Sequence, residues 1–180
     1  MKKLIVIVIL VIAGVFVFRY LESTTDKKSA LERYQKDMEM PYLKLDAFFN
    51  QSDLILATKN TSNLKKDIKE TLIPNLKAVE NDIAMISSRD EEIQKLHGEF
   101  LANIKKVHKA LNKAVKGKAS KAKQAVAKQA KAMTNYYNEH KGVLADLYQK
   151  YDAYIGNTPE PSKEPTKYDE YDKALESAKE

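Results

Sequence analysis

Cysteine is absent from the 180 residues, and so is tryptophan. The lack of cysteine excludes disulfide-stapled scaffolds, thiolate metal sites and thiol catalysis, and it leaves no cysteine after the apolar start to carry a lipid. Glycine and proline are scarce, with five residues of each. Alanine, leucine, lysine, glutamate and glutamine are abundant instead. Because these residues favour helix, the composition predicts an all-α protein.

Acidic residues are missing from a long central stretch. Residues 100–138 hold ten lysines and no acid, whereas residues 22–99 and 139–156 carry net charges of −3 and −1. The formal net charge of +6 therefore arises mainly from one basic stretch. An electrostatic partner would meet that stretch first.

A long apolar run opens the chain. Residues 4–18 have no polar side chain, and they are flanked by Lys2 and Lys3 on one side and by Arg19 on the other. Fifteen helical residues span roughly 22 Å, and extension to residue 21 brings the helix close to a hydrocarbon core of ~30 Å. We therefore predict that residues 1–21 form a transmembrane signal anchor.

A cleaved signal peptide is the alternative interpretation of this start. It would need small residues at an A-x-A-like cleavage site, but residues 16–21 are bulky. Positive charges on the two flanks nearly balance, so the short N-terminus decides the orientation. It favours a single-pass protein of the cell membrane, of a bacterial-type envelope, with residues 22–180 extracytoplasmic.

Apolar side chains recur at helical spacing through residues 22–156. Ser29 and Glu32 have capping-box spacing and predict the start of a helix, and Pro41 predicts a kink or break in it. The polar cluster 60–63 ends this helix. Its apolar face consists of Leu31, Tyr34, Met38, Leu45, Phe48 and Phe49.

The second helix has the clearest stripe, made of Leu64, Ile68, Leu72, Leu76, Val79, Ile83 and Ile86. Pro74 interrupts its middle, which predicts a kink or split near Leu72. Ser88 and Glu91 repeat the capping-box spacing, so a third helix is expected from about Asp90 to near Gly117. The buried face of that third helix comprises Ile93, Leu96, Phe100, Ile104, Val107 and Leu111.

The fourth helix is expected to be long, with few large apolar groups in its first half. Its stripe is Ala119, Ala122, Val126, Met133, Tyr137, Leu144, Leu147, Tyr151 and Tyr154. Residues 22–156 are thus predicted to form an antiparallel three- or four-helix bundle with coiled-coil-like packing. An extended coiled-coil stalk is the alternative. Residues 157–180 are acidic and hold three prolines within residues 159–165, which predicts a disordered tail.

No motif predicts catalysis or a cofactor. His97, His108 and His140 are the only histidines, and none stands in a metal-binding pattern such as Glu-x-x-His. His97 and His108 would lie about 16 Å apart along one helix, too far for a shared metal. We interpret all three as histidines at the solvent edge. The sequence therefore predicts a non-enzymatic protein with no catalytic, cofactor-binding or metal-binding residues.

Residues 116–132 are rich in lysine and alanine, and their composition resembles that of linker-histone tails. The resemblance implies binding to polyanions by counterion release, without sequence reading. The candidate residues are Lys116, Lys118, Lys121, Lys123, Lys128 and Lys131. A solvated helix face, or pairing with the acidic residues of 22–99, would also explain the lysines.

These observations predict a membrane-anchored helical bundle of the cell envelope with a binding or structural role. The alternative is a polyanion-binding protein that acts through residues 100–138. Its target would be anionic lipid, an envelope polymer or nucleic acid, and nucleic acid is not expected outside the cytoplasm. A protein partner is the other possibility, and the stripes fix no oligomeric state.

Overall fold

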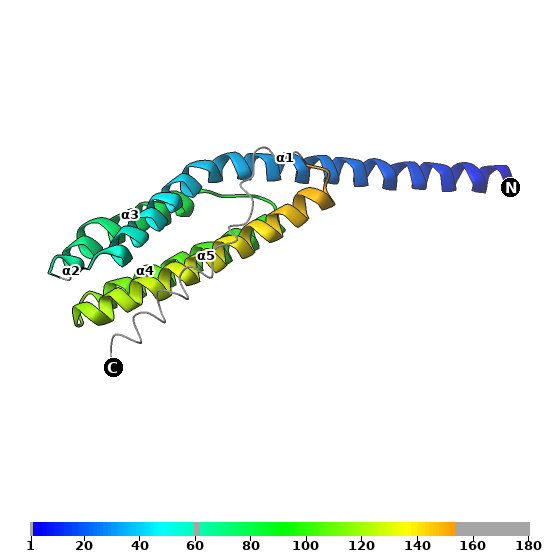
Figure 1. The fold of residues 1–180 in the computed structure, drawn as a ribbon. Coiled ribbons are helices and arrows are strands. Elements are labelled where there is room, and N and C mark those ends of the chain that lie inside the picture. The colour runs from blue at the N-terminus through cyan, green and yellow to red at the C-terminus, as the bar shows by residue number, and fades with distance from the viewer. Residues whose placement is uncertain (1, 60–61, 154–180) are drawn as a thin grey trace.

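The computed structural model describes the backbone of residues 2–59 and 62–153, and the side chains of residues 24–59 and 62–153. In these ranges the chain is all-α, as predicted, and has four helices (Figure 1). The second of them contains a π-helical turn, η1. The elements are α1 (Lys2–Ala57), α2 (Leu64–Asp67), η1 (Ile68–Leu72), α3 (Ile73–Met85), α4 (Glu91–Ala114) and α5 (Ala119–Lys150).

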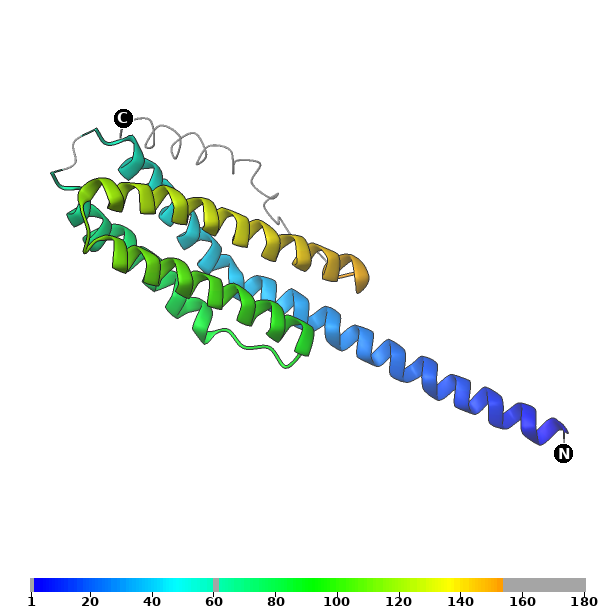
Figure 2. The same cartoon turned by 90° about the horizontal axis from the view of Figure 1, so that it is seen from below.

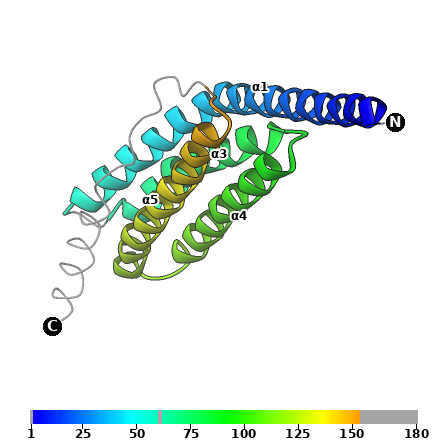
Figure 3. The ribbon, with the colours of Figure 1, turned by 90° about the vertical axis from the view of Figure 1, so that its right-hand side faces the viewer.

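The helices pack as an antiparallel bundle. Helix α1 contacts α3 and α5, and α4 contacts the same two helices on its side of the bundle. Figure 3, seen from the end where the N-terminus lies, shows the helices side by side. Their predicted stripes form one core, and this confirms the predicted antiparallel helical bundle. The predicted tail, residues 157–180, lies outside the described residues.

Helix α1 is much longer than the sequence predicts. It runs without interruption from Lys2 to Ala57, so the capping box proposed at Ser29 and Glu32 is wrong. A cap is needed only where backbone N–H groups lose their intrahelical partners, and the helix preceding Ser29 supplies those partners. The N-terminal part of α1 projects well beyond the other helices (Figure 2).

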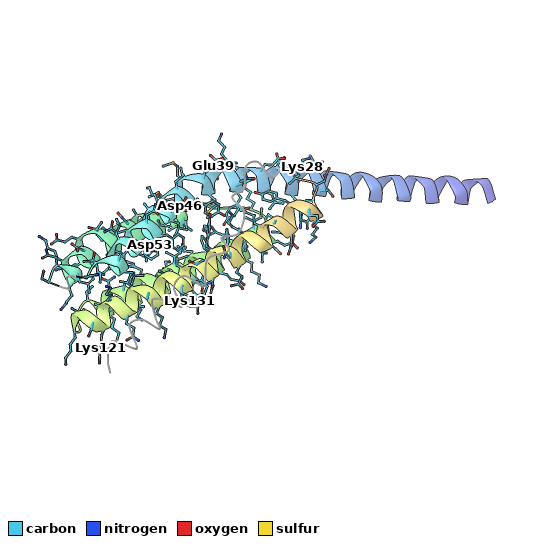
Figure 4. All side chains as sticks on the ribbon, in the orientation of Figure 1. Lys28, Glu39, Asp46, Asp53, Lys121 and Lys131 are labelled. Carbon is cyan, nitrogen blue, oxygen red and sulfur yellow. The ribbon has the colours of Figure 1, made fainter. Side chains whose placement is uncertain are left out.

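Pro41 bends α1 without breaking it. The ring removes one backbone N–H and crowds the preceding turn, which is a frequent cause of helix kinks. Figure 4 shows the helix changing direction between Glu39 and Asp46. Pro41 and Tyr42 are buried at this bend, so packing against the bundle holds the distorted turn in place.

Pro74 has the predicted effect on the second helix. The turn just before it, Ile68–Leu72, is π-helical rather than α-helical. A wider turn accommodates a proline that cannot donate a backbone hydrogen bond. The apolar stripe stays in register, because Ile68, Leu72 and Leu76 are all fully buried.

Asp90 caps helix α4, so the capping box proposed at Ser88 and Glu91 is wrong. The Asp90 carboxylate accepts a hydrogen bond from the backbone N–H of Ile93 at 3.0 Å. The Ser88 hydroxyl instead accepts from the backbone N–H of Asp90 at 3.2 Å. Ser88 therefore orders the loop that precedes the cap.

Replacing Asp90 by alanine is expected to lower the free energy of unfolding by about 1 kcal/mol, because one helix donor loses its acceptor. Asp90→Asn keeps a side-chain oxygen and should cost less. Urea unfolding of the two variants and of Ser88→Ala measures the difference. A larger loss for Ser88→Ala than for Asp90→Ala would contradict the assignment.

Small residues fill the first half of α5. Ala122, Ala127 and Ala130 are at most 1% exposed. Larger side chains take over afterwards, with Met133, Leu144 and Tyr148 also at most 1% exposed. Of the tyrosines in the predicted stripe, Tyr137 lies in the core, Tyr151 packs against it, and Tyr154 lies outside the described residues.

The predicted membrane segment lies outside the residues whose side chains are described. Its backbone is helical from Lys2 onward and is continuous with the rest of α1. Where side chains are described, no helix has the length and apolar character needed to cross a membrane. The anchor within residues 1–21 therefore stays a prediction.

Candidate functional site

The candidate lysines lie where several helix ends meet. Helix α1 ends, α2 begins, α4 ends and α5 begins at one end of the bundle, far from the N-terminus (Figure 1). We call this region the basic end. Lys121 lies at its extremity, and Lys131 lies further along α5 (Figure 4). Four of the six candidates have exposed side chains, namely Lys116, Lys118, Lys121 and Lys128.

The other two candidates are half-buried. The Lys123 ammonium donates to the backbone carbonyl of Thr58 at 2.6 Å and so ties α5 to the end of α1. Lys131 makes a contact of its own. Lys123 therefore joins two helices as well as adding charge.

The fold adds lysines that the sequence analysis did not select. The start of the second helix and the second half of α4 reach the same basic end. Their exposed lysines are Lys59, Lys65, Lys66, Lys69, Lys105, Lys106, Lys109 and Lys113. The lysines of residues 59–69 belong to a segment whose net charge is negative, so the charge pattern of the sequence did not point to them. The antiparallel packing of the helices brings them beside the α5 lysines.

The described acids leave most of the basic end uncompensated. Asp67 and Glu70 are the acids of its second-helix part, and Lys66 pairs with Glu70 at 4.0 Å. The exposed lysines of α4 and α5 at this end make no ion pair with any described residue. Pairing with the acidic part of the bundle therefore does not explain these lysines.

A polar cluster fastens the opposite end. The Lys27 ammonium donates to the Tyr151 hydroxyl at 3.1 Å and to Glu92 Oε2 at 3.3 Å. Tyr151 in turn donates to Glu92 at 2.7 Å, and Lys150 donates to the other carboxylate oxygen at 2.9 Å. Hydrogen bonds from Lys150 and Tyr151, with Lys27 adding to them, lower the pKa of Glu92 to about 2. The cluster joins α1, α4 and α5 where α1 enters the bundle.

The interpretation of the histidines as solvent-edge residues is wrong for His140. Its side chain is 2% exposed and stacks on Phe100 with ring centroids 4.2 Å apart. Its position between Tyr137 and Leu144 continues the buried stripe of α5, and this spacing was a usable signal. His97 is half-buried, and His108 bonds to Glu80 Oε2 at 2.7 Å.

Tyr34 joins two of these histidines in the core. Its hydroxyl lies 3.3 Å from His97 Nδ1 and 3.5 Å from His140 Nε2. Burial, with the nearby His97 and Lys141 adding to it, lowers the pKa of His140 to about 3. Nδ1 of His140 and the hydroxyl of Tyr42 have no hydrogen-bond partner among the described residues. His140 borders a pocket of about 50 Å³, which has room for little more than water.

A wider groove of about 1470 Å³ runs between α1 and the loop that joins α3 to α4. Arg33 lines it from α1 and Arg89 from the loop, beside Asp37 and the highly exposed Met85. The described residues that line this groove include no histidine. Across the residues whose side chains are described, no group of three or more potential ligands could hold a metal ion.

Comparison with known proteins gives one family. Residues 1–126, well over half of the chain, match the family of EMYY-motif containing lipoproteins. Residues 39–42 read Glu-Met-Pro-Tyr, which agrees with the letters of that name at three positions, and they lie at the bend of α1. No curated protein and no solved structure matches the chain. The chain belongs to the EMYY-motif containing lipoproteins, and this membership supports association with a membrane of the cell envelope.

Proposed function

We propose that this protein is a non-enzymatic, membrane-anchored stalk that holds a basic surface out into the cell envelope, where it binds a polyanion. Residues 1–21 serve as the single-pass anchor, since none of the 180 residues is a cysteine that could carry a lipid. The bundle, residues 22–156, is extracytoplasmic. The basic end is the binding surface.

The observation that carries this proposal is the continuity of α1. The helix extends from the apolar run to the basic end without a flexible linker. The 40 residues from Phe18 to Ala57 span roughly 60 Å at the helical rise. The bend at Pro41 shortens this reach only in part, and the cluster around Glu92 fixes α1 to the bundle.

This distance favours one class of target over the others. Exposed charges are screened beyond about 8 Å at physiological salt. An anchored helix tilts on average about 20° from the membrane normal, so the basic end stays far from the lipid that anchors it. The geometry therefore favours a polymer of the envelope over the head groups of the anchoring membrane. Nucleic acid would require the opposite orientation.

We also propose that the protein is not an enzyme, and this proposal rests on the side chains that line its two pockets. His140 borders a pocket of about 50 Å³, which is too small for a substrate, and the described residues that line the large groove include serines but no histidine to activate them. The groove can hold a ligand.

Cell fractionation with protease protection tests the anchor and its orientation. A C-terminally tagged full-length protein should stay with the membrane after a high-salt wash, and protease added to intact spheroplasts should degrade it. Recovery in the medium would mean a cleaved signal. Protection in spheroplasts would place the bundle in the cytoplasm and overturn the envelope proposal.

Binding of long-chain inorganic polyphosphate tests the basic end. The full-length protein in phosphatidylcholine liposomes should bind it with an affinity that falls steeply as salt rises, because binding releases counterions. Adding anionic lipid to the same liposomes should compete weakly, since the basic end stands away from the membrane. Absent or salt-independent binding would sink the polyanion proposal and leave a purely structural role.

A further inference from the structure

The exposed Lys121 and Lys128 of α5 make no ion pair with a described residue, while the chain continues for 27 residues beyond Ala153. Residues 168–180 of this continuation hold five acids against two lysines. We call them the acidic segment. We propose that this segment docks on the lysine-bearing surface of α5 in the same molecule and competes there with a polyanion. The competition rests on the function proposed above, whereas the docking does not.

A C-terminal capping motif ends α5. Asp152 adopts a left-handed conformation, with φ of 49°. The backbone N–H of Ala153 bonds to the carbonyl of Tyr148 at 3.0 Å, and that of Asp152 bonds to Gln149 at 3.4 Å. These two bonds form a Schellman motif, in which the left-handed residue ends the helix and turns the chain. The helix therefore ends at this motif.

The length of the connecting segment matches the distance to the lysines. Residues 154–167 would span about 43 Å at the rise of an extended proline-rich chain. Lys128 and Lys121 lie roughly 33 and 44 Å from Lys150 along α5, from the helical rise. A chain that folds back along α5 thus brings the acidic segment beside these two lysines.

Charge and side-chain character are complementary on the two sides. Lys121 and Lys128 are exposed. The half-buried Ala125 and Ala132 lie beside them on α5 and project little from the helix, because their side chains are small. Tyr168, Tyr171 and Leu175 are spaced for one face of a helix, with the acids around them. The chain already pairs lysine with tyrosine elsewhere, since the Lys27 and Lys150 ammonium groups lie 5.0 and 4.9 Å from the centre of the Tyr151 ring.

Zero-length carbodiimide crosslinking tests the docking directly. The full-length protein in phosphatidylcholine liposomes should give amide links between acids of the acidic segment and lysines of residues 116–128. The links should fade at about 0.5 M salt, where exposed charges are strongly screened. Liposomes that contain both unlabelled and ¹⁵N-labelled protein identify the partner. Links between labelled and unlabelled peptides in the statistical proportion would assign the segment to a second copy and overturn the intramolecular proposal.

Polyphosphate affinity tests the competition. The triple variant Asp169→Asn/Glu170→Gln/Asp172→Asn should bind polyphosphate about fivefold more tightly than the wild type at low salt. In the variant, polyphosphate no longer has to displace the acidic segment from the lysines. Glu160→Gln/Glu164→Gln changes acids of the proline-rich connection and is the control, for which no tighter binding is expected.

The two proposals fail in different ways. Crosslinks without any polyphosphate binding would support the docking and defeat the proposed function. Polyphosphate binding without crosslinks, and with equal affinity for the triple variant, would overturn the docking and leave the function standing.

Discussion

The triple variant Lys116→Gln/Lys121→Gln/Lys128→Gln is expected to bind polyphosphate about 30-fold more weakly than the wild type at low salt. The three side chains are exposed at the basic end and make no ion pair with a described residue, so the change removes polyanion contacts without breaking the fold. The dependence of affinity on salt should become shallower as well, because fewer counterions are released. A salt titration of polyphosphate binding measures both effects.

A matched control separates position from total charge. Lys28→Gln/Lys36→Gln/Lys95→Gln removes the same number of charges from the part of the bundle nearer the N-terminus. Electrostatic attraction between exposed charges is screened beyond about 8 Å at physiological salt. This variant should therefore bind polyphosphate nearly as well as the wild type. Equal losses in the two variants would mean that net charge, and not the basic end, governs binding.

Acidification is expected to destabilise the fold through His140. Its pKa is lowered to about 3 in the folded state, against an ordinary value of 6.5, chiefly by burial. Below pH 6.5 the unfolded chain therefore binds a proton that the folded chain excludes, and stability falls as the pH falls toward 3. The free energy of unfolding should drop by about 2 kcal/mol between pH 7 and pH 5 from this group alone.

His140→Phe isolates this contribution. Phenylalanine keeps a flat ring against Phe100 and cannot bind a proton, so the variant should lose most of the decline between pH 7 and pH 5 in urea unfolding. His97 is half-buried and its pKa is lowered by burial, so His97→Gln should flatten the profile less. A profile for His140→Phe that parallels the wild type would show that His140 is not buried in its neutral form.

The periodic features of this chain are local, and the sequence determined them well. The stripes of the second and third helices step by threes and fours, and the residues named in them line the core. Pro74 distorts the helix where a proline must, because the missing N–H and the bulk of the ring act within one turn. The basic stretch of residues 100–138 is likewise evident from the sequence alone.

Helix starts were predicted less well, because one sequence offers several capping arrangements. Ser29 has the spacing of a cap but lies inside a helix. Ser88 has it too, but its hydroxyl accepts from Asp90, which is the actual cap. Which of these residues caps a helix depends on where that helix starts, and the packing of the helices determines its start.

The sequence by itself determined an all-α chain with an apolar start, a basic central stretch and an acidic end, since these follow from composition and from the helical repeat. Only the tertiary structure decided that the lysines of residues 59–69 join the α5 lysines and that α1 connects the apolar run to the basic end. The physical reason is that helical periodicity fixes which face of each helix is apolar. Which helix ends meet, and which polar groups lose water, depends on how helices of particular lengths pack against one another.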